Sequence, residues 1–87
     1  VLLECVPNEV GQSITESLEV PVIGIGAGPF VDGQILVLYD ALGITPGRKP
    51  RFVKDFLRGA QSPRIGLEAY VTAVKTRTYP APEHCFS

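Results

Sequence analysis

Long apolar runs, closely spaced cysteines and an excess of positive charge are all missing from this chain of 87 residues. Its longest apolar run has about half the ~20 residues that a membrane-spanning helix needs, so we expect no transmembrane segment. Eight basic residues stand against nine acidic ones, which lacks the positive excess typical of nucleic-acid binding. The two cysteines, Cys5 and Cys85, match neither a zinc-binding spacing nor a CxxC redox motif. We therefore expect reduced thiols.

The composition is that of an ordinary globular protein, with 45% hydrophobic and 20% charged residues. A chain of this length forms one domain at most, and this composition argues against global disorder. The chain opens on Val1-Leu2-Leu3, inside an apolar run of strand type, with no Met and no basic leader. We therefore expect a segment cut from a longer protein.

The first 25 residues have the pattern of a strand, a helix and a second strand. Residues 1–6 and 22–25 are short apolar runs, and Pro21 blocks continuation of the helix between them. Asn8 is a good N-cap residue for that helix. Such a βαβ unit predicts a parallel sheet, whose two open edges must be covered by upstream residues or by a partner. The apolar stripe of the helix consists of Val10, Ile14 and Leu18.

The middle of the chain predicts a second helix over 32–43, which begins near a possible cap, Asp32, and ends at Gly43. A loop follows over 43–50, because this range contains two prolines and two glycines. The expected apolar face of the helix consists of Ile35, Leu36, Leu38, Tyr39 and Leu42.

Two further helices are expected before a proline-containing tail that runs over 79–87. The first is short and amphipathic over 52–57, with Gly59 after its end. The second begins at Ser62, an N-cap residue followed by a proline, and ends near Thr78. Its apolar positions are Leu67, Tyr70, Val71 and Val74.

Glu4 is the most informative single residue, because a carboxylate in an apolar strand is costly unless it is paired, hydrated or functional. It lies at the carboxyl end of the first predicted strand, where parallel α/β proteins build their active sites. Burial there raises the pKa of a carboxyl group toward the range of a general base. The alternative is a structural glutamate bonded to a neighbouring strand or backbone amide. Cys5 is expected on the opposite face as an inert buried thiol.

The second predicted strand runs into three alternating glycines, Gly24, Gly26 and Gly28. The dinucleotide-binding pattern GxGxxG is absent, because Pro29 stands where it needs a glycine. Alternating glycines let a backbone approach a ligand or another strand closely, and amides near Asp32 would suit a carboxylate or phosphate. The alternative is a tight strand exit required only by packing. Asp32 itself is favoured as a helix cap over a site residue.

Five of the eight basic residues fall within eleven positions. They suit an acidic ligand tail, a neighbouring subunit or a solvated face, and the solvated face is favoured. His84 has only Glu83 and Cys85 beside it, so we expect no metal site in the tail. No serine lies in a GxSxG context, which excludes a nucleophile elbow. The basic residues are Arg48, Lys49, Arg51, Lys54 and Arg58.

Several of these segments, taken in their order and spacing, resemble the ketopantoate hydroxymethyltransferase family, also called 3-methyl-2-oxobutanoate hydroxymethyltransferase. The resemblance covers essentially the whole chain, and it depends on the ordered sum of segments that are individually weak. The segments are LECVP at 3–7, PVIGIGAG at 21–28, DGQILV at 32–37, Phe52-Val53-Lys54, Tyr79-Pro80 and Glu83-His84.

The resemblance implies a (β/α)₈ TIM barrel, of which residues 1–87 would be the last two parallel strands and the C-terminal helices of a single domain. It implies transfer of a hydroxymethyl group from 5,10-methylenetetrahydrofolate to 3-methyl-2-oxobutanoate, giving 2-dehydropantoate in pantothenate and coenzyme A biosynthesis. It also implies a cytoplasmic homo-oligomer, commonly a decamer, that holds the keto acid with Mg²⁺. Neither nucleic acid nor membrane is expected as a partner.

In this family the glutamate of the LECVP stretch is the proton acceptor, so the resemblance implies that role for Glu4. The metal ligands come from earlier strands, so no metal site is expected in this chain, and the missing N-terminal barrel strands are its expected partner. Gly24, Gly26 and Gly28 remain candidates for substrate contact. The basic segment 48–58 then suggests contact with the polyglutamate tail of folate. The alternatives are another barrel enzyme that binds phosphate or carboxylate at this glycine loop, or a non-catalytic packing or oligomerisation module.

Overall fold

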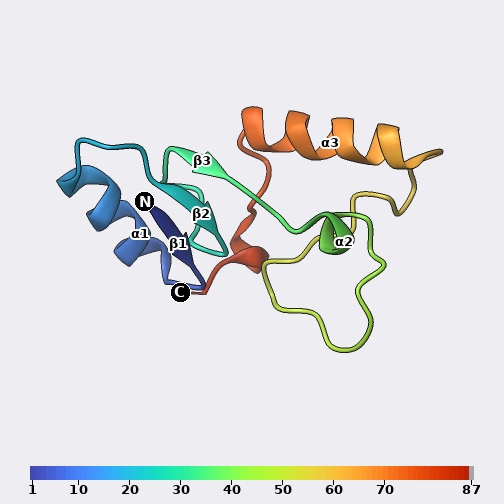
Figure 1. Ribbon diagram of the computed structural model, residues 1–87, viewed down its shortest axis with the longest axis horizontal. Coiled ribbons are helices and arrows are strands. Elements are labelled where there is room, and N and C mark those ends of the chain that lie inside the picture. Colours follow the sequence, from blue (N-terminus) through green and yellow to red (C-terminus); the bar gives the residue numbers. More distant parts are fainter. Residues whose placement is uncertain (87) are drawn as a thin grey trace.

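The computed structural model describes residues 1–86, so Ser87 at the end of the predicted tail lies outside the described residues (Figure 1). Three strands pair in the order β1-β2-β3, and both pairs are parallel. This confirms a parallel α/β arrangement. The elements are β1 (Leu2–Glu4), α1 (Asn8–Ser17), β2 (Ile23–Ile25), β3 (Gly33–Gln34), α2 (Leu38–Ala41), α3 (Pro63–Lys75) and a 3₁₀ turn, η1 (Pro82–His84).

The predicted strand–helix–strand unit is confirmed as β1-α1-β2. In the parallel register Leu2 lies opposite Ile23, and Glu4 lies opposite Ile25. The pairing continues past the end of β1, because the N–H of Cys5 donates to the Ile25 carbonyl at 3.0 Å. None of the helices in residues 1–86 combines the length and the apolar character needed to cross a membrane.

A third parallel strand lies where the sequence predicted the beginning of a helix over 32–43. The Asp32 carboxylate accepts a hydrogen bond from the Val22 N–H at 2.8 Å. The N–H groups of Asp32 and Gly33 donate to the Val22 carbonyl at 2.9 and 3.2 Å. Asp32 therefore ties its segment to β2 instead of capping a helix, and β3 forms where only two strands were expected. The helical part of this range is the single turn of α2.

The connection from β2 to β3 spans only residues 26–32 and contains no helix, although parallel strands usually need a crossover of about a dozen residues. It lies flat between the sheet and α1, where Ala27 and Val31 are buried. Two glycines make this close packing possible. A Cβ on Gly11 of α1 would lie 2.5 Å from the Ala27 carbonyl oxygen, and one on Gly24 would lie 3.1 Å from the Ala27 Cβ. This loop therefore covers one face of the sheet.

The start of α1 differs from the prediction, because Pro7 and not Asn8 occupies the N-cap position. The Pro7 carbonyl accepts hydrogen bonds from the N–H groups of Val10 and Gly11, both at 3.1 Å. The Asn8 side chain instead packs against Gly28, and its Oδ1 is buried without a hydrogen-bond partner in the described residues.

The short helix predicted over 52–57 is wrong, because the backbone there forms turns and irregular structure. The N–H of Phe56 donates to the Ala41 carbonyl of α2 at 2.7 Å. The Asp55 carboxylate accepts from the N–H groups of Leu57 and Arg58 at 2.9 and 3.2 Å. These amides are therefore used for contacts with α2 and for a local turn, which leaves them unavailable to a helical ladder.

The predicted last helix is confirmed as α3. Ser62 caps it, accepting the N–H of Ile65 at 3.3 Å, and a proline follows in the first turn. The helix ends at Lys75, three residues before the expected end at Thr78. It stops early because Arg77 adopts a left-handed backbone conformation with φ of 61°.

An aromatic cluster forms the second part of the core, beyond the carboxyl ends of the strands. The ring of Phe56 packs edge-on against Tyr70 of α3 and against Tyr79, with both ring centroids 5.3 Å away. The Tyr79 hydroxyl donates to the Phe52 carbonyl oxygen. Gly66 lets α3 approach, because a Cβ there would lie 3.0 Å from the Phe56 carbonyl oxygen. The cluster thus joins α3 to the irregular segment below it.

The C-terminal turn η1 is held in place by His84. Its Nδ1 accepts a hydrogen bond from the Ala81 N–H at 3.0 Å, and its ring centroid lies 5.0 Å from that of Tyr79. Burial lowers the pKa of His84 below its usual 6.5; the negative charge of Glu83 opposes this shift and the positive charge of Lys54 adds to it. The turn therefore depends on an uncharged imidazole.

We expect acidification to loosen this turn. Because the folded-state pKa of His84 is lowered, its contribution to stability is present above the ordinary value of 6.5 and is lost as pH falls through the folded pKa. The urea midpoint of unfolding should therefore fall between pH about 7.5 and about 5.5. In His84→Asn, whose amide oxygen can accept the Ala81 N–H without titrating, the fall should be smaller. An equal fall in both proteins would contradict this role.

Candidate functional site

The structure confirms the position predicted for Glu4, as the last residue of β1. It lies at the carboxyl edge of the three parallel strands, opposite Ile25 of β2. The burial that would adjust this carboxyl group for a general base is not present in the described residues, where Glu4 is exposed. The carboxylate therefore stands free at the end of the sheet where parallel α/β proteins bind their ligands.

Glu4 projects from the face of the sheet that α1 does not cover. Side chains alternate along a strand, and residues paired in register share a face, which sets Leu2 and Glu4 beside Ile23 and Ile25 of β2 and Ile35 just after β3. Ile25, directly opposite Glu4, is buried, whereas Leu2 is 58% exposed and Ile35 is 45% exposed. We call Leu2, Glu4, Ile23 and Ile35, the part of this face that is not buried, the open sheet face. An apolar sheet face left in water is unusual for parallel strands, which are normally covered on both sides.

Cys5 is exposed, so the prediction of a buried thiol is wrong. Its backbone is left-handed, with φ of 54°, which breaks the strand alternation directly after Glu4. Partial desolvation raises the pKa of the Cys5 thiol, and the negative charge of Glu4 raises it further. The thiol is therefore protonated at neutral pH. Cys85 is buried, its Sγ donating to the Ala81 carbonyl at 3.3 Å, and both cysteines are free, as predicted.

Gly24 within β2 and the two glycines that follow it, Gly26 and Gly28, are buried and make close contacts within the chain. Gly24 faces the 26–32 loop. Gly26 and Gly28 have left-handed φ values of 68° and 81°, which favour glycine. A Cβ on Gly26 would lie 2.7 Å from a ring carbon of Phe52, and one on Gly28 would overlap the Asn8 side chain. Packing accounts for these glycines, and their contact with a substrate stays a prediction.

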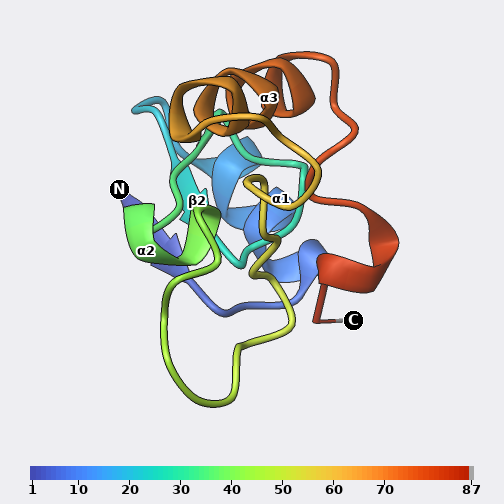
Figure 2. The ribbon, with the colours of Figure 1, turned by 90° about the vertical axis from the view of Figure 1, so that its right-hand side faces the viewer.

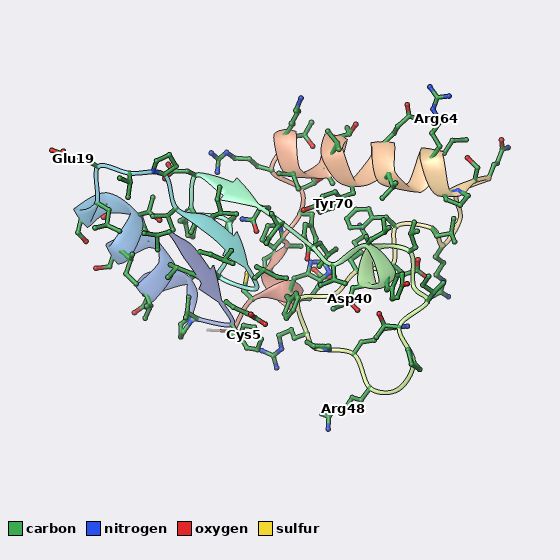
Figure 3. The ribbon with its side chains drawn as sticks, viewed as in Figure 1. Cys5, Glu19, Asp40, Arg48, Arg64 and Tyr70 are labelled. Carbon is green, nitrogen blue, oxygen red and sulfur yellow. The ribbon has the colours of Figure 1, made fainter. Side chains whose placement is uncertain are left out.

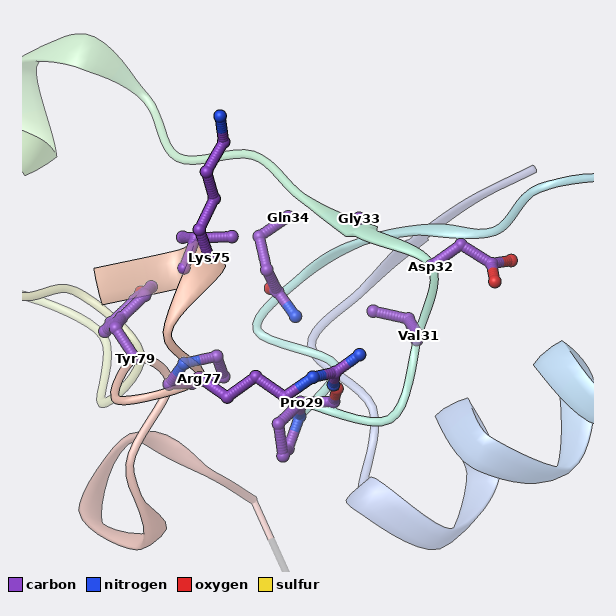
Figure 4. A pocket seen from close by; sticks show the side chains of 10 residues that line it. Pro29, Val31, Asp32, Gly33, Gln34, Lys75, Arg77 and Tyr79 are labelled. Carbon is purple, nitrogen blue, oxygen red and sulfur yellow. The ribbon is translucent and has the colours of Figure 1, made fainter. Parts of the chain in front are cut away.

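A cavity of about 230 Å³ lies between β3 and the carboxyl end of α3 (Figure 4). Gln34 donates to the Gly28 carbonyl at 2.8 Å, and Arg77 donates to the Pro29 carbonyl at 3.1 Å, so both side chains brace the 26–32 loop. Gln34 projects from the face opposite the open sheet face. This cavity is therefore not the site of Glu4. The amides predicted to hold an anion near Asp32 are not at a helix start, because no helix begins there.

The basic residues predicted as a cluster are all exposed. Arg51 donates to the Cys85 carbonyl at 3.1 Å, and Nζ of Lys54 lies 5.0 Å from the centroid of the Phe56 ring. Arg48 stands at the tip of the loop after α2 and points away from the rest of the molecule (Figure 3). The cluster is thus anchored at one end and free at the other.

These features define a class: a parallel α/β sheet with a carboxylate at its carboxyl edge and an apolar face that is only partly covered. Comparison with known proteins then identifies the family. The ketopantoate hydroxymethyltransferase family matches residues 1–82. The chain belongs to this family.

Individual relatives agree with the family match. The chain is 59% identical over 86 residues to the 3-methyl-2-oxobutanoate hydroxymethyltransferase of Chromohalobacter salexigens, covering 99% of this chain and 33% of the relative. It is 59% identical over 86 residues to the protein of that name from Alkalilimnicola ehrlichii, covering 99% of this chain and 31% of the relative. It is 57% identical over 86 residues to that from Marinobacter nauticus, covering 99% of this chain and 33% of the relative. The chain thus spans about a third of the length of the curated relatives it matches.

Proposed function

We propose that this chain is the part of a ketopantoate hydroxymethyltransferase that carries the proton acceptor, Glu4. The complete enzyme would transfer a hydroxymethyl group from 5,10-methylenetetrahydrofolate to 3-methyl-2-oxobutanoate and form 2-dehydropantoate. The observation that carries the proposal is the position of Glu4, at the carboxyl edge of the sheet and on the open sheet face, in a chain that belongs to this family. The names of the relatives supply the reaction class.

The chemistry assigned to Glu4 is removal of the C3 proton of the keto acid. That C–H bond lies next to a carbonyl group, so its electron pair can move into the C2–C3 bond as the carboxylate takes the proton. The resulting enolate then forms a bond from C3 to the one-carbon unit, whose two bonds to the folate nitrogens are broken in the course of the transfer. Water supplies the hydroxyl group of 2-dehydropantoate, and tetrahydrofolate leaves with the proton balance restored. A positioned carboxylate base suits this step. We assign proton removal to Glu4 and assign no step of the reaction to another residue of this chain.

The open sheet face supports a larger sheet around Glu4. We propose that strands from the remainder of the enzyme pair with the free edges and cover Leu2, Ile23 and Ile35, completing a barrel. Burial of such apolar side chains stabilises by roughly 25 cal/mol per Å². The same covering would exclude water around Glu4, and desolvation strengthens a carboxylate as a base.

The residues that the structure describes do not form a magnesium site among themselves. Within residues 1–86 no three His, Cys, Asp or Glu side chains gather closely enough to hold a metal ion. We therefore propose that the ligands of the Mg²⁺ implied for this family lie in the rest of the enzyme. The proposal for Glu4 does not depend on them.

A chimera tests the proposed function. In it this chain replaces the matching third of the C. salexigens relative. The chimera should form 2-dehydropantoate from 3-methyl-2-oxobutanoate and 5,10-methylenetetrahydrofolate, as followed by chromatography, with the unmodified relative as the reference. A folded chimera that forms no product would refute the proposal and favour a non-catalytic packing module.

A further inference from the structure

The loop after α2 carries a concentration of positive charge that the proton-acceptor role of Glu4 does not explain. We define the basic loop as residues 47–54. It contains four cations and no acidic residue, in a chain whose net charge is −1. All four cationic side chains are exposed. The cations are Arg48, Lys49, Arg51 and Lys54.

The basic loop is joined directly to the edge of the sheet that carries Glu4. Phe52 packs so closely on Gly26 that a Cβ there would lie 2.7 Å from its ring. Gly26 follows Ile25, the register partner of Glu4, and its carbonyl accepts the Val6 N–H at 3.1 Å. The loop therefore starts from the same end of the strands as the proposed base.

The basic loop lies beyond the carboxyl edge of the strands, the edge at which Glu4 stands. Figure 1 shows the chain after β3 leaving the sheet in the direction in which the strands point, so that α2 and the basic loop lie beyond the carboxyl edge. In Figure 2 this loop and α3 lie on opposite sides of the molecule. The loop and α3 therefore extend beyond the carboxyl edge on different sides of the molecule.

We propose that the basic loop binds the acidic tail of the folate donor, a chain of glutamyl carboxylates. This inference rests on the proposed function, and it adds the part of the donor that this chain recognises. Arg51 and Lys54 are anchored, by the Cys85 carbonyl and the Phe56 ring. Arg48 stands at the outer tip of the loop (Figure 3). Cations spread along a loop match carboxylates spread along a flexible tail better than they match one compact anion.

The effect expected from exposed ion pairs is moderate and sensitive to salt. Each such pair is weak and screened by ions, so the benefit grows only with the number of tail carboxylates. A donor with five glutamyl residues is therefore expected to have a KM roughly tenfold lower than a donor with one. Salt at about 0.5 M should remove most of this difference.

The test uses the chimera and two donors, monoglutamyl and pentaglutamyl 5,10-methylenetetrahydrofolate. In the double variant Arg48→Ala/Lys49→Ala, the KM ratio between the two donors should fall from about tenfold toward one. Lys75→Ala, which removes an exposed cation at the end of α3, should keep the ratio of the parent chimera. An unchanged ratio in the double variant would overturn the inference.

A binding measurement separates this inference from the proposed function. Titration with γ-linked pentaglutamate peptide, followed by calorimetry, should show binding to the chimera and roughly tenfold weaker binding to the double variant. If product forms normally but both proteins bind the peptide equally, the tail inference fails and the proposed function stands. If the double variant instead changes the oligomeric state of the chimera without changing peptide binding, the loop is a subunit contact and the inference is refuted.

Discussion

Replacing Glu4 with glutamine is expected to slow exchange of the C3 proton of 3-methyl-2-oxobutanoate by about 10²- to 10⁴-fold in the chimera. The amide keeps the size and shape of the side chain at the end of β1, but it cannot accept the proton. The rate is measured by proton NMR in D₂O, from the loss of the C3 signal without folate. The absence of the donor isolates proton removal from the later bond-forming step.

Glu9→Gln is the matched control, because Glu9 is also an exposed glutamate but lies in the first turn of α1. It should exchange the proton at the rate of the parent chimera. Binding of the keto acid should change little in either variant, since the prediction assigns Glu4 to proton removal and not to affinity. Exchange at the parent rate in Glu4→Gln would exclude Glu4 as the base.

The position of Glu4 could be predicted from the sequence, and its surroundings only in part. A strand that ends at a carboxylate before Pro7 is a local pattern, and the structure confirms it. The exposure of the Glu4 side chain could not be predicted, because burial depends on what lies across the sheet. Ile25 on the same face is buried, but Leu2 and Ile35 are about half exposed, so the described residues cover that side only in part.

The third strand could not be predicted from local patterns because a distant contact decides it. Leucine and isoleucine spacing over 32–43 fits a helix, and Asp32 fits a cap. Its carboxylate instead accepts the N–H of Val22, ten positions earlier in the chain. A hydrogen bond of that range depends on the tight 26–32 loop, whose packing against Gly11 leaves no signature in the sequence around Asp32.

The helix predicted over 52–57 is wrong for a similar reason: local spacing fits a helix, but contacts with distant parts of the chain decide the backbone. Phe52 and Phe56 stand four positions apart, which suits one helical face, but the two rings pack on different parts of the molecule. Phe52 lies against Gly26 at the end of β2, and Phe56 lies against α3 and the C-terminal segment. Sequence spacing shows that both side chains are core residues, and it does not show that they belong to two separate contacts.

Phe56→Ala is expected to lower the free energy of unfolding by about 3–5 kcal/mol. The Phe56 side chain is only 6% exposed, and its ring is the contact shared by Tyr70 and Tyr79. Removing it leaves a cavity where α3 meets the irregular segment, and the two tyrosine rings, whose centroids lie 6.0 Å apart, cannot fill the space without moving α3. Urea unfolding of the chimera, followed by circular dichroism, measures the loss.

Phe30→Ala provides the comparison, because Phe30 is also a phenylalanine but is 48% exposed. Its loss should be below about 1 kcal/mol, as for most exposed positions. Equal losses in the two variants would mean that the aromatic cluster is not the core of this half of the chain. The comparison also bears on the basic loop, since Lys54 rests on the Phe56 ring. A folded Phe56→Ala chimera should therefore also bind γ-linked pentaglutamate more weakly, because the anchor of the loop would be lost together with the ring.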